Sequence, residues 1–302
     1  MPIHDPYADK LAEIPTQQRS VVVGGRSTAY WEYGNVDSTA FLVMVHGFRG
    51  DHHGLEPIVA ELGSDIRILI PDLPGFGISD ALTSPADIDA YASWLRGFLV
   101  AVDAPEDAVV LGHSFGSIVV GAALDAGLPV HRVILINPIA ANALKGPRGI
   151  MTRLAVLYYK AAAALPARAG YALLKNKMIV RVMSETMAKT KDANLRAWIH
   201  DQHDQYFSLF ASRDSVLEAF ETSVKNDISQ YANGITQDVL MLVADQDDIT
   251  ALPEQRKLAE RIPTAQLEVV EGVGHLVHYE APDFAARNIR LFLGLPLHEE
   301  MR

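Results

Sequence analysis

The sequence contains no cysteine, which excludes disulfide bonds, thiolate metal sites and cysteine nucleophiles. It is also short of positive charge, because 26 lysine and arginine residues stand against 37 acidic residues, and the formal net charge is −11. A chain this acidic repels the phosphate backbone of nucleic acids. We therefore expect no nucleic-acid partner.

Long apolar runs are lacking as well. The most apolar window, residues 154–174, is interrupted by Lys160, Pro166 and Arg168, so we predict no transmembrane segment. Residues 1–10 show no basic stretch followed by an apolar core, so no secretory signal is visible and we expect a cytoplasmic protein. Nothing in the sequence indicates an oligomeric state. Of the 302 residues, 49% are hydrophobic and 21% are charged. This composition is typical of a globular protein with a core of normal size.

Short apolar runs alternate with amphipathic stretches over most of the chain. This alternation predicts an α/β fold, with a mostly parallel central sheet and helices on both of its faces. The expected strands are residues 41–45, 66–70, 108–111, 132–136, 239–244 and 267–270, after a hairpin of residues 19–23 and 27–33. The expected helices are residues 55–62, 86–102, 115–126, 253–261 and 282–293.

The alternation stops between residues 141 and 234, where the pattern is helical throughout. A segment of this length is too long for a loop, so we predict an inserted helical subdomain, or cap. The core domain then consists of residues 19–140 and 235–302, and the cap of residues 141–234. Residues 1–18, which are polar and contain proline, are expected to form an N-terminal arm.

Residues 112–116 (Gly-His-Ser-Phe-Gly) lie between an expected strand and an expected helix. A Gly-x-Ser-x-Gly sequence in this context predicts a tight turn that exposes the serine oxygen near the helix N-terminus, where the helix dipole favours negative charge. The flanking glycines allow the strand and the helix to approach closely. We therefore predict that Ser114 is a nucleophile. His113, at the variable position of the turn, is either structural or a substrate contact.

Residues 46–50 (His-Gly-Phe-Arg-Gly) follow the apolar run of residues 41–45. A small turn at this place can aim a backbone N–H group toward Ser114, so the N–H groups of Phe48 and Phe115 are candidates for an oxyanion hole. Arg49 is either a solvated loop charge or a contact for a substrate carboxylate or phosphate. We expect His46 to make a structural hydrogen bond within the loop.

A serine hydroxyl is a poor nucleophile unless a base removes its proton, and a histidine oriented by a carboxylate suits that role. Candidates lie just after two expected strands. Asp245, Asp247 and Asp248 follow residues 239–244, and His275 follows residues 267–270. These are carboxyl ends of strands, where ligands gather in open parallel sheets.

Four segments together resemble the α/β-hydrolase fold family: residues 41–47, 71–79 (Pro-Asp-Leu-Pro-Gly-Phe-Gly-Ile-Ser), 112–116 and 272–275 (Gly-Val-Gly-His). The resemblance is greatest to its capped esterases, monoacylglycerol lipases and carbon–carbon-bond hydrolases, and covers about residues 20–294 apart from the helical block. It implies the order serine, acid, histidine, and it points to Asp247 as the acid, with Asp248 as the alternative. Ser114 excludes the branches of the family that use an aspartate nucleophile.

The resemblance implies a serine hydrolase that cleaves carboxylic esters of small or acyl-chain substrates through an acyl-enzyme. Carbon–carbon-bond hydrolysis of meta-cleavage-type diketones, or acyl transfer, would use the same triad, and a non-catalytic ligand-binding protein is a third alternative. We expect no cofactor. The 11 histidines do not form a His-Glu-x-x-His pattern, so we expect no metal. Apolar and methionine side chains of the cap are expected to line the substrate pocket and set its specificity.

Overall fold

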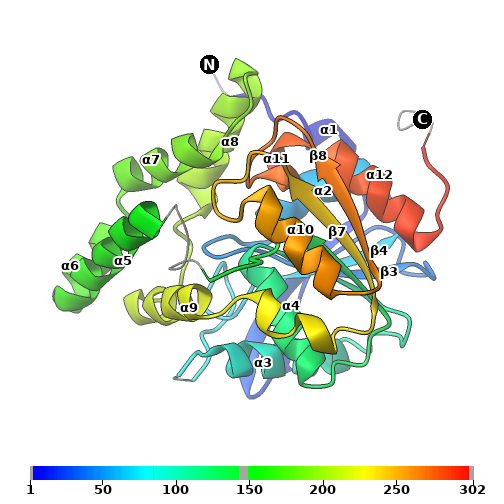
Figure 1. Cartoon of the computed structure of the whole chain (residues 1–302), viewed down its shortest axis with the longest axis horizontal. Helices are drawn as coiled ribbons and strands as arrows, with labels where there is room; N and C mark the ends of the chain where they lie inside the picture. Colours follow the sequence, from blue (N-terminus) through cyan, green and yellow to red (C-terminus); the bar gives the residue numbers. More distant parts are fainter. Residues whose placement is uncertain (1–2, 84, 143–148, 299–302) are drawn as a thin grey trace.

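An eight-stranded sheet runs through the core (Figure 1), in the order β1-β2-β4-β3-β5-β6-β7-β8. The computed structural model describes residues 3–83, 85–142 and 149–298. Only the β1–β2 and β2–β4 pairs are antiparallel, so the predicted α/β fold with a mostly parallel sheet is confirmed. The strands are β1 (Thr16–Val23), β2 (Arg26–Tyr33), β3 (Phe41–Val45), β4 (Arg67–Pro71), β5 (Val109–His113), β6 (Arg132–Ile136), β7 (Asp238–Ala244) and β8 (Ala265–Val270).

Helices cover both faces of the sheet because its central strands carry apolar side chains on both sides. One face packs against α3 (Ile88–Ala101), α4 (Phe115–Asp125) and α10 (Leu252–Arg261). The other face packs against α2 (Glu56–Leu62) and α12 (Pro282–Leu293). β3 and β5 are buried along their full length, so the segments that follow them start from rigid positions.

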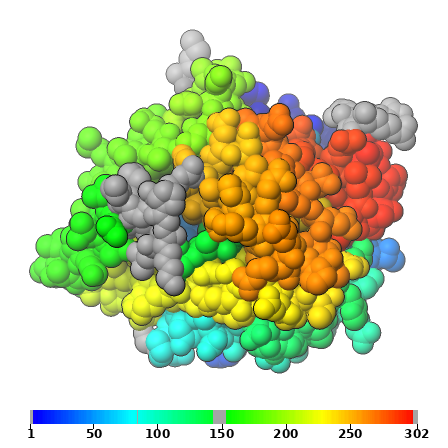
Figure 2. Space-filling model, in the orientation of Figure 1, coloured from blue at the N-terminus to red at the C-terminus, as the bar shows by residue number. Residues whose placement is uncertain are grey.

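The described residues between β6 and β7, where the sequence predicts the cap, form five α-helices and two short 3₁₀ helices, Ile228–Gln230 and Ala232–Gly234. The α-helices are α5 (Gly149–Ala164), α6 (Ala167–Leu174), α7 (Lys177–Met187), α8 (Ala193–Tyr206) and α9 (Arg213–Lys225). Figure 1 shows α5 to α8 beside the sheet rather than on one of its faces, and Figure 2 shows their green side chains next to the orange C-terminal part of the core. Asn176, Asp192 and Ser212 cap the N-termini of α7, α8 and α9 through their side chains, which marks where these helices begin.

The N-terminal segment is more ordered than the expected arm. It contains the short helix α1 (Ala8–Ala12), and β1 begins at Thr16, three residues before the expected strand. The side chains of Tyr7 and Ile14 are buried, and the Tyr7 hydroxyl donates to the backbone oxygen of Tyr279 at 3.1 Å. The burial of two apolar side chains therefore holds this segment against the core, although its composition is mostly polar.

A second difference follows His275, where the short helix α11 (Val277–Glu280) precedes α12. Sequence periodicity does not detect a helix of four residues. Among the described helices, none is long and apolar enough to cross a membrane.

Candidate active site

Ser114 occupies the turn between β5 and α4 with a φ of 52° and a ψ of −117°. A positive φ is strained for a residue with a Cβ, and such strain is typical of functional sites. Glycines are required around it. A Cβ on Gly112 would lie 2.6 Å from the backbone oxygen of Gly116, and a Cβ on Gly116 would lie 2.3 Å from that of Val45. The Gly-x-Ser-x-Gly sequence thus encodes the close approach of helix and strand that exposes the serine.

The structure brings Ser114, His275 and Asp247 together in one chain of hydrogen bonds. His275 Nε2 lies 2.8 Å from Ser114 Oγ, and His275 Nδ1 lies 2.8 Å from Asp247 Oδ2. The other oxygen of Asp247 accepts the backbone N–H groups of Ile249 (2.7 Å) and Thr250 (3.2 Å). Because the buried carboxylate accepts the Nδ1 proton, His275 Nε2 presents a lone pair to the serine hydroxyl.

The two neighbouring aspartates lie elsewhere. Asp248 pairs with Lys189, which lies between α7 and α8, and the Asp248 side chain is 44% exposed. Asp245 accepts the backbone N–H of Gly272 at 2.7 Å and so closes the loop that precedes His275. Of the three candidates, Asp247 is the one hydrogen-bonded to His275.

The loop of residues 46–50 lies against the serine. A Cβ on Gly47 would be 3.2 Å from Ser114 Cβ. His46 fixes this loop, because its Nδ1 donates to the Gly47 oxygen (2.8 Å) and its Nε2 accepts the N–H of Leu73 (2.8 Å). Phe115 is the first residue of α4, and the first N–H groups of a helix have no partner within the helix. The N–H groups of Phe48 and Phe115 therefore remain the candidates for an oxyanion hole.

Arg49 is neither a solvated charge nor part of the surface that Ser114 faces. Its side chain is fully buried, and it donates to the backbone oxygens of Leu174 (2.7 Å) and Phe207 (3.0 Å). It also contacts the Tyr159 hydroxyl (3.2 Å) and lies over the Phe207 and Phe210 rings. The structure thus places the guanidinium in the interface between core and cap.

His113 is buried beside the triad. Its Nε2 lies 3.4 Å from the backbone oxygen of His275, and its ring is 4.1 Å from that of His278. Burial, with a smaller contribution from His275, lowers the pKa of His113 to about 3, so the imidazole is neutral. His113 also lines the cavity next to Ser114, which is compatible with both of its predicted roles.

The cavity that contains Ser114 and His275 has a volume of about 160 Å³. This is small beside the roughly 300–1,000 Å³ of many ligand pockets. Met183 and Met187 of α7 and Phe207, just after α8, line it from the cap. Its polar lining comes from His46, Asp51, His113, His203, His278 and Tyr279, in addition to Ser114 and His275.

Comparison with known proteins shows the family of this chain. Residues 42–287 match the alpha/beta hydrolase family. The chain belongs to that family. It is 24% identical over 286 residues to the proline iminopeptidase PfmaB of Pestalotiopsis fici. The matched region covers 90% of this chain and 98% of that protein. Among solved structures, a thermophilic esterase from Thermogutta terrifontis matches with a TM-score of 0.71, 21% identity, and 92% and 98% coverage. The esterase EaEST from Exiguobacterium antarcticum matches with a TM-score of 0.75, 18% identity, and 92% and 100% coverage.

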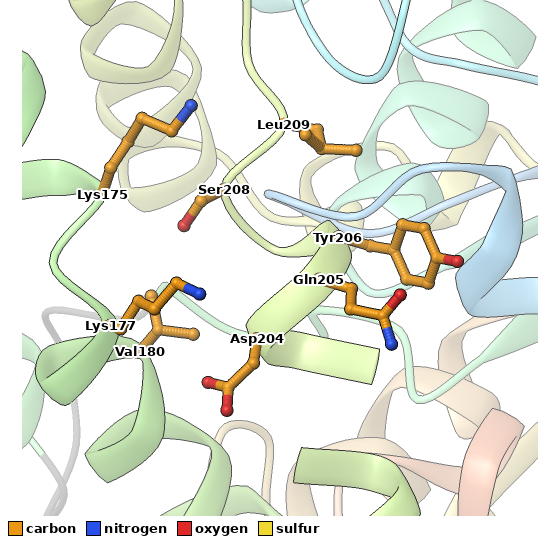
Figure 3. A pocket seen from close by; sticks show the side chains of 8 residues that line it. All are labelled: Lys175, Lys177, Val180, Asp204, Gln205, Tyr206, Ser208 and Leu209. Atoms are coloured by element: carbon orange, nitrogen blue, oxygen red, sulfur yellow. The ribbon is translucent and has the colours of Figure 1, made fainter. Parts of the chain in front are cut away.

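The family and these relatives identify the chain as a hydrolytic enzyme. A larger hollow in this hydrolase, of about 440 Å³, lies within the cap and contains none of the triad residues. Figure 3 shows Lys175 and Lys177 on one side of it and Asp204, Gln205 and Tyr206 of α8 on the other. The smaller cavity, which holds the hydrogen-bonded serine, is the better candidate for the reaction.

Two further residues position the histidine loop, Asn137, for which no role was predicted, and Glu280. Asn137, with a φ of 40°, donates from Nδ2 to the backbone oxygens of Gly274 (3.1 Å) and His275 (2.9 Å), and its Oδ1 accepts the N–H of Ala244 (2.9 Å). Glu280 accepts the N–H groups of Gly274 (3.1 Å) and of Thr190 in the cap (2.6 Å). The position of Asn137 directly after the strand of residues 132–136 is the signal that could have found it.

Among the described residues, one group could offer three metal ligands, namely Asp51, His52 and His53. Its imidazoles are already engaged, because His52 Nδ1 lies 2.9 Å from Asp72 Oδ1 and His53 Nδ1 lies 3.1 Å from Asp51 Oδ1. The His52 ring also stacks on Trp31, and the His53 ring on Tyr206. These contacts give both histidines a structural role between β2 and the cap.

Proposed function

We propose that this hydrolase is a serine carboxylesterase that acts on small esters through an acyl-enzyme. The observation that carries the proposal is the continuous chain of hydrogen bonds from Ser114 through His275 to Asp247. Esterases among the structures that resemble it support the choice of an ester bond. The small volume of the cavity favours small substrates.

In the first half of the reaction, Ser114 Oγ attacks the ester carbonyl while His275 Nε2 takes the hydroxyl proton. Asp247 holds the tautomer of His275 and stabilises the imidazolium that forms. The N–H groups of Phe48 and Phe115 hold the negative charge on the carbonyl oxygen. The carbon–oxygen bond of the ester breaks, His275 returns its proton to the leaving alcohol, and the acyl group stays on Ser114.

In the second half, water attacks the acyl-enzyme and His275 accepts its proton. The tetrahedral species collapses, Ser114 leaves with the proton from His275, and the carboxylic acid is released. A carbon–carbon-bond hydrolase or an acyltransferase would use the same residues with a different substrate or acceptor. Product analysis separates the three reactions, since only ester hydrolysis turns simple esters into free acid and alcohol when other acceptors are present.

The decisive test is Ser114→Ala. It removes the nucleophile, so kcat for p-nitrophenyl acetate should fall by about 10⁴–10⁶-fold, as in other serine hydrolases. Ser20→Ala, at an exposed position of β1, is the matched control and should retain activity. A fluorophosphonate probe should label wild type and Ser20→Ala but not Ser114→Ala. Labelling of the Ser114→Ala variant, or its near-normal turnover, would refute the assignment.

A further inference from the structure

An acidic side chain lines the cavity directly after the loop that approaches Ser114. Asp51 is only 1% exposed, and its Oδ1 lies 3.1 Å from both the backbone N and the ring Nδ1 of His53. Its other oxygen, Oδ2, is buried, and the described residues supply no hydrogen-bond partner for it. Leaving a buried carboxylate oxygen unpaired costs free energy, so a bound group that donates a hydrogen bond would be stabilised there.

A second polar group belongs to the same part of the cavity. Tyr279 is 4% exposed, and its hydroxyl lies beside Gly54, where a Cβ would be 3.5 Å away. The hydroxyl takes no part in the contact with Tyr7, which uses the backbone oxygen of Tyr279. Burial, together with the charges of Asp51 and Glu56, raises the pKa of the Tyr279 phenol, so it stays protonated and can both donate and accept.

Asp51 is the acidic side chain in the described lining of the cavity, and its Oδ1 is paired with His53 Nδ1. Arg49, which the sequence offered as a contact for a substrate carboxylate or phosphate, directs its guanidinium into the cap instead. The neighbouring carboxylate of Asp51 would repel a substrate anion in a cavity of this size. A neutral hydroxyl or a protonated amine has the opposite effect, because each brings the N–H or O–H group that Asp51 Oδ2 lacks.

We propose that Asp51 and Tyr279 form a subsite for a hydrogen-bond donor, a hydroxyl or an ammonium, on the ester substrate. The proposal rests on the proposed esterase function and names the substrate class of that same site. Asp51 Oδ2 accepts from the donor, and the Tyr279 hydroxyl completes its hydrogen bonds. A substrate with a donor group makes this hydrogen bond, and a substrate of the same shape with a methyl group does not. An enzyme site built for such a hydrogen bond discriminates strongly between the two substrates.

The test compares esters whose donor and methyl members match in size and differ in one group. For the acyl part, these are methyl 3-hydroxypropanoate, methyl 3-aminopropanoate and methyl butanoate, with monomethyl succinate as the anion. For the alcohol part, 2-hydroxyethyl butanoate is compared with propyl butanoate. We expect wild type to prefer a donor-bearing member over its methyl isostere by about tenfold or more in kcat/KM, which corresponds to one hydrogen bond to a charged group. The kcat/KM of methyl 3-aminopropanoate relative to methyl 3-hydroxypropanoate shows whether the subsite prefers an ammonium or a hydroxyl. Monomethyl succinate should have the lowest kcat/KM of the acyl-part esters.

Two variants locate the preference. Asp51→Asn keeps an oxygen for the His53 N–H but replaces the unpaired Oδ2 with an amide donor, and Tyr279→Phe removes only the hydroxyl. Each should reduce the donor-to-methyl ratio of kcat/KM at least threefold, mainly through KM. Asp107→Asn makes the same charge change at an exposed site and should preserve the ratio. Melting temperatures identify a variant that fails to fold, in which case the other variant decides.

Three outcomes would overturn the subsite. Wild type could treat the donor and methyl members alike, or the preference could persist in both variants. Alternatively, calorimetric titration with Zn²⁺ could show stoichiometric binding that Asp51→Asn abolishes, which would make Oδ2 a metal ligand. Fluorophosphonate labelling of Ser114 is measured in every sample, so loss of the subsite is distinguishable from failure of the esterase proposal.

Discussion

Arg49 Nη2 donates to the backbone oxygen of Leu174 at 2.7 Å, which joins the loop after β3 to the last residue of cap helix α6. The same guanidinium donates to the Phe207 oxygen, and Phe207 also lines the cavity beside Ser114. A loop that carries one oxyanion candidate, Phe48, therefore also anchors the cap. The buried side chain of Arg49 therefore links the position of the cap to the loop beside the nucleophile.

Replacement of Arg49 by methionine should destabilise the protein. The change leaves the buried oxygens of Leu174 and Phe207 without their donor, which should lower the free energy of unfolding by on the order of 2–5 kcal/mol. KM for small esters should rise as well, because Phe207 loses its anchor. Urea unfolding and steady-state kinetics measure the two effects. Arg26→Met, at an exposed residue of β2, is the matched control, and equal stability of the two variants would contradict the anchoring role.

The choice between Asp247 and Asp248 can be tested with two adjacent and chemically identical changes. Asp247→Asn should lower kcat by about 10⁴-fold, because the amide no longer holds the tautomer of His275 or stabilises its charge. Asp248→Asn should keep kcat close to that of wild type and cost at most about 1 kcal/mol through its partly exposed pair with Lys189. The assignment would be wrong if the larger loss of kcat belonged to Asp248→Asn.

The sequence predicted the parts of the site that are encoded locally. The turn at Ser114 depends on glycines two residues away on each side, and His275 follows its strand directly, so short patterns are enough to find them. The parallel strands were also predictable to within two residues at each end, because strands buried on both faces are continuous apolar runs. Resemblance to a family then selected Asp247, which the structure places against His275.

The features that escaped prediction depend on contacts between distant segments. Arg49 is separated from Leu174 by 125 residues and from Phe207 by 158, and no periodicity in the sequence links them. Tyr7 is buried against Tyr279, which lies 272 residues away. The polar composition of residues 1–18 indicated an arm. In the structure, the buried side chains of Tyr7 and Ile14 hold that segment on the core.

Buried histidines should make the stability of this hydrolase depend on pH. Burial lowers the pKa of His113 to about 3, and burial together with His200 lowers the pKa of His203 to about 3. In the unfolded chain both imidazoles titrate near 6.5. Between about pH 6.5 and 3 the unfolded state therefore binds more protons than the folded state, so the stability is fully present above pH 6.5 and is lost as the pH falls.

His113→Gln should weaken this pH dependence, because glutamine stays neutral in both states. Each histidine with a lowered pKa removes about 1.4 kcal/mol from the free energy of unfolding per pH unit in that window. Between pH 7.5 and 5.5, the variant should therefore lose about 1.4 kcal/mol less stability than wild type in urea unfolding. His131→Gln, at an exposed imidazole, controls for the loss of a histidine and should follow wild type. If His113→Gln lost as much stability as wild type between the two pH values, then the His113 imidazole would not be held neutral by its burial beside the triad.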